Sequence, residues 1–566
     1  MFIKLGKFKR RPSYQNINPE DVFIDSENLP GFESSRFEGR LEKPMSHGLF
    51  IFMKGSLLII ALILVSKLWI LSVRQGPVYT QISENNRLEQ TLVFANRGVI
   101  YDRNKVELAT NVIKVEGRDF PARFYASISG IAHVVGYLKY PMVDKNGFYY
   151  ETDYRGRDGA ERAYDEYLRG ANGLKLKETD VFGEVTSEAI IEKPVDGGEL
   201  ILSIDAHLSE ALYKAIENLA HKSSFVGGAG VVMDVRTGEI LALVSYPEYD
   251  ENLLTEGSRQ PAINALIQSS SKPFLNRAIA GLYTPGSIVK PIVATAALNE
   301  EIISPAKKIL STGQISVPNP YDRSKPTIFK DWKAHGWTDM KEALAVSSDT
   351  YFYSIGGGFG DQKGLGITLL DEYFRIFGLT EKTGIELLGE LEGVIPTPEW
   401  KAKHFDGDIW RLGDTYITAI GQYGTEITPL NAARFTAAIA NGGKILKPSI
   451  ILGGVESPVE RSINFRDEDW KIVREGMRAG VSGPGGTSAG LNVPYVKVAA
   501  KTGTAEVGSN KKYVNSWSIG FFPYDEPKYA WAVVMERGPA SNTIGATSVT
   551  RQLFDWIAVY NPKYFE

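Results

Sequence analysis

The chain of 566 residues contains no cysteine. This absence excludes disulfide bonds, thiol catalysis and cysteine metal ligands. Its six histidines are scattered, with no H-E-x-x-H pattern and no close pair, so neither a metal site nor a cofactor is predicted. The net charge is -4, and no basic run with interleaved aromatic residues indicates a nucleic-acid surface. The remaining composition, 43% hydrophobic and 23% charged, is that of a globular protein with about two to four domains.

One long apolar run stands near the N-terminus. Residues 49–73 are interrupted only by Lys54 and Lys67, and the run is long enough to cross a bilayer core of about 30 Å. A buried core helix or a cleaved signal peptide would be the alternatives, but the run is long for a signal and no small-x-small cleavage site follows it. We therefore predict a tail at 1–47 and a single transmembrane anchor at 48–73. The basic residues of the tail place it in the cytoplasm, and a large exported body without disulfides is typical of a bacterial envelope protein.

After the anchor, the patterns predict a β-rich module and then a larger domain. A hairpin is expected at 94–109 and a helix at 156–170, and neither holds groups with assignable chemistry. The later predicted elements are a strand at 200–205, a helix at 206–220, a hairpin at 228–246, a polar loop at 318–330 and a helix at 338–345. We therefore predict an α+β protein with a pedestal at 74–199 and a second domain at 200–566.

Ser287 and Lys290 stand one helical turn apart where an apolar helix is expected to begin. Pro285 and Gly286 predict a turn, so the hydroxyl should lie at the helix N-terminus with the amine beside it. A buried lysine loses its preference for the charged form, and a neutral amine can take a hydroxyl proton. The spacing alone is a weak signal, because three other pairs share it without a long apolar helix after them. These pairs are Ser269/Lys272, Ser304/Lys307 and Ser509/Lys512.

A second hydroxyl and a carboxylate, Ser347 and Asp349, follow the helix predicted at 338–345. Their ordinary interpretation is a helix N-cap, since serine and aspartate favour that position. Their chemical interpretation is a proton relay to a leaving amine, with an acceptor that holds the lysine in place. The local sequence leaves both interpretations open.

The segment at 496–506 alternates like a strand, and two more predicted strands follow it, as at the edge of an antiparallel sheet. It carries a cation, two hydroxyls and a glycine: Lys501, Thr502, Thr504 and Gly503. Cation and hydroxyls together can hold a carboxylate, and the glycine lets a substrate approach the backbone. A second Lys-Thr-Gly at 382–384 follows a helix end, so we expect it in a loop.

The segment Gly486-Thr487-Ser488-Ala489-Gly490 matches G-x-S-x-G, the pattern of a nucleophile elbow. That motif needs a strand before it, a helix after it and a later histidine. Glycine and proline precede it here, and no histidine lies beyond His404. We predict a flexible loop at the edge of a cleft.

Taken in order within one domain, Ser287/Lys290, Ser347/Asp349 and Lys501-Thr502-Gly503 resemble the motifs of the penicillin-recognising serine transferases. Further segments along the chain are similar to class B penicillin-binding proteins: 97–104, 156–170, 246–252, 276–278, 413–415, 421–422 and 428–430. Asp349 looks more like the elongation (rod-shape) branch than the division branch, where asparagine is usual. The stretch 104–156 is short for the head subdomain of that branch.

The resemblance implies a penicillin-binding transpeptidase domain with a central antiparallel sheet flanked by helices. It implies a peptidoglycan D,D-transpeptidase that cross-links stem peptides through a serine acyl-enzyme and is acylated by β-lactams. Lys290 would deprotonate Ser287, and the N–H groups of Ser287 and Thr504 would form the oxyanion hole. Lys501, Thr502 and Thr504 would hold the terminal carboxylate, with Gly503 between them. Ser347 and Asp349 would support Lys290 and deliver the proton.

The same resemblance implies a location and partners. The catalytic domain would lie outside a bacterial cytoplasmic membrane and act with a SEDS-type glycan polymerase and membrane proteins of the elongation complex. A β-lactamase, a membrane-bound β-lactam sensor and a non-catalytic envelope scaffold are the alternatives. A β-lactamase would not need the anchor or the pedestal, and a sensor would have several spans. A scaffold would tolerate loss of the motifs.

Overall fold

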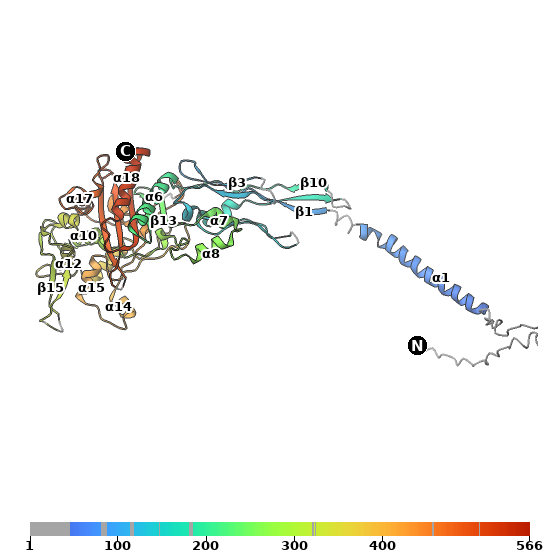
Figure 1. Cartoon of the computed structure of the whole chain (residues 1–566), viewed down its shortest axis with the longest axis horizontal. Coiled ribbons are helices and arrows are strands. Elements are labelled where there is room, and N and C mark those ends of the chain that lie inside the picture. Colours follow the sequence, from blue (N-terminus) through green and yellow to red (C-terminus); the bar gives the residue numbers. More distant parts are fainter. Residues whose placement is uncertain are drawn as a thin grey trace, which may run out of the picture. The chain divides into compact units, whose positions relative to one another are not determined.

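The computed structural model describes residues 46–80, 88–113, 118–145, 148–179, 185–319, 322, 324–454, 458–508 and 510–566. Except for its last two residues, the tail predicted at 1–47 lies outside the described residues. The chain forms two compact units, one of 1–89 with 178–187 and the other of 90–177 with 188–566 (Figure 1).

The first unit contains one long helix. α1 (His47–Trp69) continues into the π-helix η4 (Ile70–Arg74), and together they form 28 helical residues that contain an 18-residue window with a mean hydropathy of 2.5. None of these residues is buried by the protein itself, so an apolar surface is left around the whole helix. Its length and composition are sufficient to cross a membrane, as predicted for 48–73.

The part of the chain between residues 88 and 201 is rich in short strands. A four-stranded sheet has the order β11-β2-β3-β4, and a three-stranded sheet the order β1-β9-β10. Their bounds are β1 Leu88–Val93, β2 Ile100–Tyr101, β3 Glu107–Val112, β4 Ala122–Tyr125, β9 Gly173–Thr179, β10 Val185–Glu192 and β11 Leu200–Ile201. Two small two-stranded sheets lie between them in sequence: β5 (Leu138–Lys139) with β8 (Arg155–Gly156), and β6 (Met142–Val143) with β7 (Tyr149–Glu151). β2 and β3 form the predicted hairpin.

Buried charges hold this part together. Glu161 accepts hydrogen bonds from Arg97 at 2.5 Å and from Arg123 at 2.8 Å, and all three side chains are fully buried. Arg97 also contacts Asp165 at 2.8 Å. Burial alone would raise the pKa of the Glu161 carboxyl, but the charges of Arg123 and Arg97 outweigh it and the pKa is lowered. The carboxylate is therefore ionised, and it neutralises guanidinium groups that would otherwise be buried alone.

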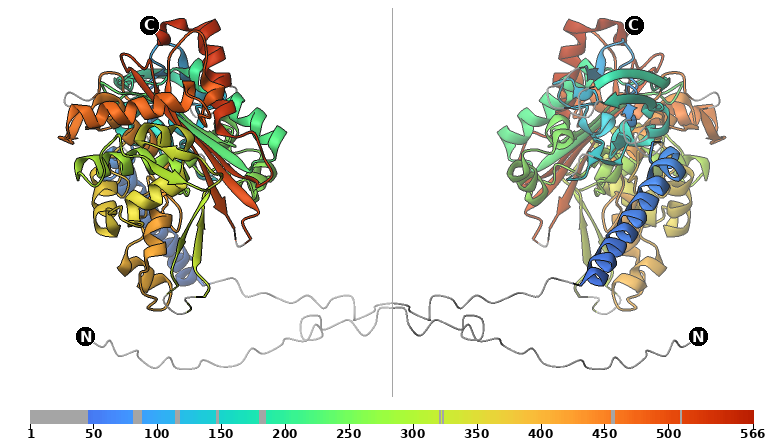
Figure 2. Two further views of the ribbon diagram at one scale, coloured as in Figure 1. Left: turned by 90° about the vertical axis from the view of Figure 1, so that its left-hand side faces the viewer. Right: turned by 90° about the vertical axis from the view of Figure 1, so that its right-hand side faces the viewer.

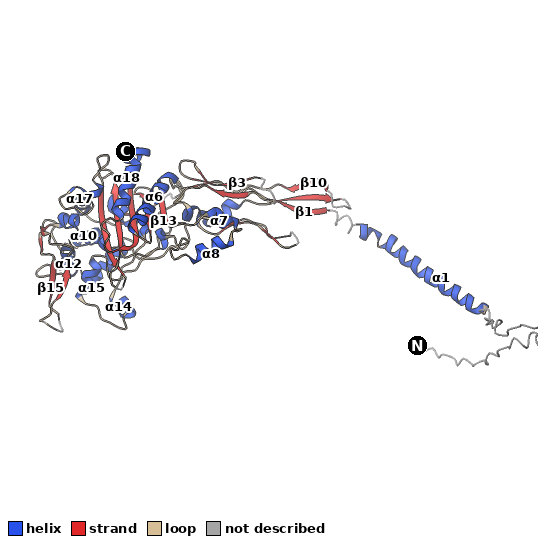
Figure 3. Ribbon diagram, in the orientation of Figure 1, coloured by secondary structure: helices blue, strands red, loops and turns tan. Residues whose placement is uncertain are grey.

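The core of the larger C-terminal part is a five-stranded antiparallel sheet of order β13-β12-β22-β21-β20 (Figure 3). The strands are β12 Gly227–Asp234, β13 Ile240–Tyr246, β20 Ala499–Val507, β21 Tyr513–Phe522 and β22 Tyr529–Pro539. The predicted hairpin at 228–246 and the three predicted C-terminal strands are therefore all present, and β20 is an edge strand, as predicted. Every residue of β12 is buried, because helices cover both faces of the sheet.

Because side chains alternate along each strand, the two faces of the sheet pack against two separate apolar clusters. Val231 and Met233 of β12 belong to a cluster with α10 (Lys290–Asn299) and α16 (Pro429–Asn441). Val232, which points the other way, belongs to a cluster with α6 (Ala206–Ser223) and α18 (Ala546–Tyr560). In the left-hand view of Figure 2, α17 (Asp467–Ser482), in orange, lies beside the strands. This enclosed sheet is a rigid support for groups on β20.

The second unit contains further α-helices. They are α3 Ala132–Val135, α4 Gly159–Ala163, α5 Asp165–Arg169, α7 Glu251–Glu256, α8 Gln260–Gln268, α9 Arg277–Ala280, α11 Met340–Val346, α12 Asp349–Gly357, α13 Gly366–Ile376, α14 Pro398–His404 and α15 Leu412–Ala419. Short strand pairs are β14 (Ile309–Ser311) with β17 (Gly336–Thr338), β15 (Gln314–Val317) with β16 (Thr327–Lys330), and β18 (Lys444–Leu446) with β19 (Val459–Ser462).

Three expectations need correction. The predicted polar loop at 318–330 ends in a strand, β16, which pairs with β15 from Val317↔Thr327 to Gln314↔Lys330. The predicted helix at 156–170 is two short helices, α4 and α5, separated at Tyr164, whose φ of -117° and ψ of 28° are not helical. The strand predicted at 200–205 is confined to β11.

Candidate active site

Ser287 lies in a short 3-10 helix, η5 (Gly286–Val289), which leads directly into α10. Gly286 has a φ of +58°, a conformation that side chains rarely adopt, and its N–H donates to the Gly421 carbonyl at 2.8 Å. A Cβ at Gly286 would meet the Thr504 carbonyl oxygen at 2.8 Å, and one at Gly503 would meet the Pro285 carbonyl oxygen at 2.5 Å. The two glycines thus let the serine turn lie directly against β20.

Side chains from two other segments fix this contact. The Trp517 indole on β21 donates to the Thr284 carbonyl at 2.9 Å, just before the turn. The Gln422 amide donates to the Thr504 carbonyl of β20 at 3.3 Å. The half-buried Ser287 hydroxyl lies at the cleft and makes no side-chain hydrogen bond with the described residues. It is therefore held in place by the backbone and is available to a substrate.

Lys290, at the start of α10, is fully buried, and its ammonium group reaches the loop between α11 and α12. It donates to Asp349 Oδ1 at 2.6 Å, to the Ser347 carbonyl at 2.9 Å and to Ser347 Oγ at 3.3 Å. A buried charge is tolerated only when it is paired and hydrogen-bonded, and Asp349 supplies the pair. Removing one member of such a buried pair costs about 3–5 kcal/mol.

Lys501 approaches Ser347 from the other side. It is buried on β20 and donates to Ser347 Oγ at 2.8 Å and to the Thr502 carbonyl at 2.9 Å. Burial lowers the pKa of Lys501 well below its usual value, and the charge of Lys290 lowers it further. The Ser347 hydroxyl therefore lies within hydrogen-bonding distance of two amines, of which one has a reduced proton affinity.

The two interpretations of the second motif apply to different residues. Ser348 is the N-cap of α12, with its hydroxyl accepting from the Tyr351 N–H at 3.3 Å. Ser347 ends α11 in the left-handed conformation, at a φ of +57°, and this turn directs its hydroxyl to the amines. Asp349 is the first residue of α12. Ser348 therefore caps the helix, and the adjacent Ser347 contacts the two lysines at the cleft.

Asp331, which the sequence did not indicate, supports this loop from beneath. Its Oδ2 accepts from Ser348 Oγ at 2.8 Å, from the Thr350 N–H at 3.0 Å and from Ser311 Oγ at 3.1 Å. Its Oδ1 accepts from the Trp332 N–H at 2.9 Å. Burial would raise the pKa of this carboxyl, but the backbone N–H groups, the Ser348 hydroxyl and the Lys290 charge lower it. Asp331 is therefore an ionised anchor for the segment that carries Ser347 and Asp349.

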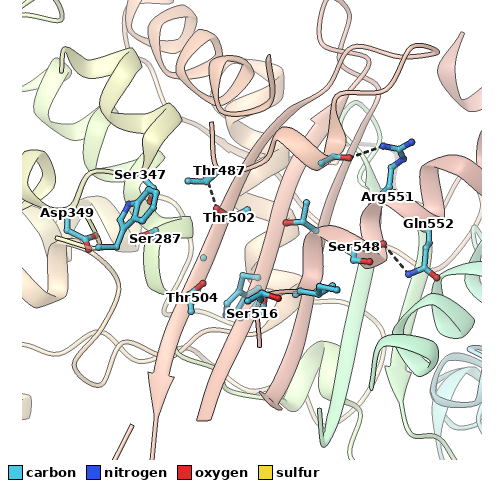
Figure 4. Close-up of a pocket in the computed structure, with 18 residues that line it drawn as sticks. Ser287, Ser347, Asp349, Thr487, Thr502, Thr504, Ser516, Ser548, Arg551 and Gln552 are labelled. Carbon is cyan, nitrogen blue, oxygen red and sulfur yellow. Dashed lines mark hydrogen bonds between the residues drawn. The ribbon is translucent and has the colours of Figure 1, made fainter. Parts of the chain in front are cut away.

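A cleft of about 830 Å³ runs from these groups along β20 to α18 (Figure 4). Its lining comprises Ser287, Trp332, Ser347, Asp349, Thr487, Gly490, Thr502, Gly503, Thr504, Ser516, Trp517, Thr543, Ile544, Gly545, Thr547, Ser548, Arg551 and Gln552. All the predicted site residues except Lys290 and Lys501 line it, and these two lysines contact lining groups from below. Trp332, Trp517 and the α18 residues were not expected there, because no motif marks them.

The other candidate motifs do not supply a nucleophile to the cleft. Thr487 lies at the cleft edge, as predicted, where its hydroxyl accepts from Thr502 Oγ1 at 2.8 Å. Ser488 is fully buried with no hydrogen-bond partner for its hydroxyl, so it cannot act as a nucleophile towards a ligand in the cleft. In the loop at 382–384, the buried Thr383 bonds to Glu390. Ser509 lies outside the described residues.

This geometry is suited to acyl transfer. A hydroxyl at a helix start faces a cleft bordered by an edge strand, and edge strands offer unpaired backbone groups to an extended peptide. Two amines and a relay hydroxyl can move the proton that such a reaction must transfer. Among the described residues, no group of three or more His, Asp or Glu residues could hold a metal ion.

Comparison with known proteins gives a family. The model of the penicillin binding protein transpeptidase domain matches residues 228–555, and that of the penicillin-binding protein dimerisation domain matches residues 112–202. The peptidoglycan D,D-transpeptidase MrdA of Haemophilus influenzae is 32% identical, over 85% of this chain and 75% of its own length.

Solved structures agree with these matches. PBP2 of Helicobacter pylori, in its complex with MreC, is similar with a TM-score of 0.69 and 26% identity, covering 83% of this chain and 98% of that one. A chain of a peptidoglycan synthase complex that coordinates polymerization and crosslinking is similar with a TM-score of 0.69 and 27% identity, covering 90% and 97%.

Proposed function

The chain belongs to the penicillin-binding protein transpeptidases, and from that membership we propose a role for each residue around its cleft. It is a peptidoglycan D,D-transpeptidase of the elongation branch, like the MrdA proteins that it resembles over most of its length. In our proposal Ser287 is the nucleophile, and its target is the carbonyl of the penultimate D-Ala of a stem peptide. The terminal carboxylate would be held by Lys501, Thr502 and Thr504.

We assign the proton transfers of acylation to the two lysines and Ser347. In its neutral form Lys290 takes the Ser287 proton as Oγ bonds to the carbonyl carbon, and the backbone N–H groups of Ser287 and Thr504 stabilise the oxyanion. The bond to the terminal D-Ala nitrogen then breaks. Ser347, hydrogen-bonded to both Lys290 and Lys501, passes the proton to that nitrogen, and D-Ala leaves as an amine. Asp349 holds Lys290 in place during the transfer.

Cross-linking reverses these proton transfers. The amine of a neighbouring stem peptide attacks the acyl-enzyme carbonyl and loses a proton through the same relay, and the Ser287 oxygen leaves and is reprotonated. The observation that carries the proposal is the Ser347 hydroxyl between two buried amines, 2.8 Å from Lys501 and 3.3 Å from Lys290, in a cleft that Ser287 lines.

The test uses labelled penicillin and intact mass. A β-lactam resembles the D-Ala-D-Ala end, so the wild-type protein should gain one adduct and Ser287→Ala none. Ser488→Ala is the matched control: it removes the buried serine of the G-x-S-x-G segment and should label like wild type. An adduct that persists in Ser287→Ala discards the assignment.

A β-lactamase with the same residues is the alternative function, and a nitrocefin hydrolysis assay distinguishes it from a transpeptidase. A transpeptidase keeps its acyl-enzyme and turns nitrocefin over slowly, whereas a β-lactamase hydrolyses it continuously. The apolar helix at 47–74 supports a membrane-anchored transpeptidase instead.

We further propose the surroundings in which the enzyme acts. The helix at 47–74 would anchor it in the bacterial cytoplasmic membrane with the N-terminus inside, a pedestal would occupy 74–199, and the catalytic domain would occupy 200–566 outside. A SEDS-type glycan polymerase and elongation-complex membrane proteins are its proposed partners, since similar chains occur in a PBP2–MreC complex and in a peptidoglycan synthase complex. Whether the short stretch 104–156 retains such contacts is tested by a pull-down from membranes, with acylation rates compared with and without the partner.

A further inference from the structure

A second cavity, of about 390 Å³, lies in the segment that runs from β8 through α4 to α5. Cavities of this size are typical of small-ligand sites. The lining residues are mostly basic: Arg155, Gly156, Arg157, Arg162, Asp165 and Arg169. No step of the proposed transpeptidase mechanism uses this cavity, so its concentration of arginines needs a separate explanation.

Asp165 lines this cavity, but its charge is already compensated. Its Oδ1 accepts from Arg97 at 2.8 Å and from the Gly156 N–H at 2.8 Å. Arg97 and Arg123 together supply two positive charges to the two carboxylates of Glu161 and Asp165. Of the described residues that line the cavity, Asp165 is the only acidic one. The lining arginines therefore receive no net negative charge from this group.

Two of the lining arginines have carboxylate partners that do not line the cavity. Arg155 contacts Glu151 at 2.8 Å, and Arg169 contacts Asp153 at 3.3 Å. The side chains of both pairs are partly exposed, and ion pairs in contact with water are weak. A guanidinium has five N–H donors, so each of these arginines can keep its partner and still donate to a ligand.

The other two, Arg157 and Arg162, form no ion pair with the described residues, and both are exposed. Asp158, next to Arg157 in sequence, accepts instead from the Tyr249 hydroxyl at 2.7 Å and does not line the cavity. Burial raises the pKa of the Tyr137 phenol near Arg157, so that phenol is neutral and supplies no counter-charge. Two guanidinium groups of the cavity are therefore left without a paired carboxylate.

We propose that this cavity binds a phosphate monoester group, either of a free phosphate ester or of a lipid headgroup. Such a group carries close to two negative charges near neutral pH and has three strong acceptor oxygens on one phosphorus atom. Two unpaired guanidinium groups in one cavity match this charge, and the planar fork of arginine suits bidentate hydrogen bonding to phosphate oxygens. An acidic peptide carries its charges on separate carboxylates, so it concentrates less charge in the same space.

The test measures binding to the full-length protein in phosphatidylcholine nanodiscs by isothermal titration. One probe is glycerol phosphate, and the second, dihexanoyl phosphatidic acid, carries the same phosphate on a short-chain lipid. The third is the N-acetyl amide of a dipeptide of two aspartates, which carries two negative charges as carboxylates. Both phosphates should bind at least tenfold more tightly than the dipeptide, which corresponds to about 1.4 kcal/mol.

The two phosphate probes also distinguish the sources. Equal affinity for both supports a site for a free phosphate ester, because the acyl chains then contribute nothing. A tenfold preference for phosphatidic acid supports a site for a lipid headgroup. Either result, if it depends on the lining arginines, supports the proposed phosphate site.

That dependence is measured with Arg157→Gln and Arg162→Gln, each of which should weaken binding of glycerol phosphate at least tenfold. Arg259→Gln is the matched control: Arg259 is likewise exposed and forms no ion pair with the described residues, but it does not line the cavity. It should bind like wild type. All three variants should keep the wild-type melting temperature, since none of these side chains holds an ion pair together.

Three results would overturn the proposal. They are no binding of either phosphate by wild-type protein, binding of the dipeptide as tight as that of the phosphates, and wild-type affinity in both Arg157→Gln and Arg162→Gln. None of these measurements uses acylation of Ser287, so the outcome is independent of the proposed function.

Discussion

Asp331→Asn tests whether a buried carboxylate outside the three motifs supports the active-site loop. The wild-type side chain is fully buried and accepts four hydrogen bonds, from Ser311, Ser348, Thr350 and Trp332. Hydrogen bonds to a charged group contribute about 1 kcal/mol more than neutral ones. Asparagine removes the charge from all four and presents an NH₂ where one oxygen accepted. The variant should therefore lose about 4 kcal/mol of stability.

Two measurements check this value. At about 2 °C per kcal/mol, the low end of the range for domains of 150–250 residues, the melting temperature should fall by about 8 °C. Labelled penicillin should also acylate Ser287 at least tenfold more slowly, because small misplacements of the Ser347 loop have large effects on rate. Ser311→Ala removes one donor and leaves the loop tethered by the others, so it should cost about 2 kcal/mol and acylate at nearly the wild-type rate.

The pH dependence has a definite sign. The pKa of Asp331 is lower in the folded protein than in the unfolded chain, so its stabilisation is complete above about pH 4 and is lost as the pH falls through the folded value. The difference between wild type and Asp331→Asn should accordingly be constant near neutral pH and shrink below about pH 4. A variant that melts and acylates like wild type at pH 7 would refute the anchoring role.

Three further substitutions have specific expected outcomes. Lys501→Met should abolish acylation yet raise stability by about 1 kcal/mol at pH 7 in chemical denaturation, because the lowered pKa means that the folded protein binds the Lys501 proton less tightly than the unfolded chain does; the gain should vanish as the pH rises towards about 10. Glu161→Ala should cost about 3–5 kcal/mol, measured the same way, because it leaves the buried Arg123 guanidinium without a carboxylate and Arg97 with Asp165 alone. Gly503→Ala should slow penicillin acylation by at least tenfold in a rate assay, since its Cβ would lie 2.5 Å from the Pro285 carbonyl oxygen.

The elements that the sequence predicted well are those whose burial imposes a pattern. The hairpin of β12 and β13, the helix α6 and the strand β20 are covered by the core, so apolar residues recur with the period of each element. β16 was missed because its pattern is weak: it belongs to a two-stranded pair, and Ile328 is 49% exposed. The break between α4 and α5 at Tyr164 was missed because neither glycine nor proline marks it.

The residues of the site likewise divide into those that the sequence predicted and those that it missed. Ser287, Ser347 and Lys501 were found because each belongs to a short motif with fixed spacing. Asp331 has no such relation to its partners, since its bonds to Ser348 and Thr350 cross 17 and 19 residues between a loop and a helix start. Arg551 is likewise 50 residues beyond Lys501 in sequence and is brought to the cleft only by the packing of α18 on the sheet. Contacts between residues so far apart in sequence depend on the tertiary fold, so no local sequence pattern predicts them.

The sequence also did not predict that burial would lower the pKa of Lys501. Burial was expected to favour a neutral Lys290, but the fold places the Asp349 carboxylate 2.6 Å from that ammonium group and so compensates its charge. Lys501 is equally buried, and both of its hydrogen-bond acceptors, Ser347 Oγ and the Thr502 carbonyl, are neutral. The positive charge of Lys290 adds to the effect of burial and lowers the pKa of Lys501 further. Placing two amines around one hydroxyl while pairing only one of them with a carboxylate makes the pair unequal. Because Lys501 binds its proton less tightly than an ordinary lysine does, it can give that proton to the Ser347 hydroxyl more readily.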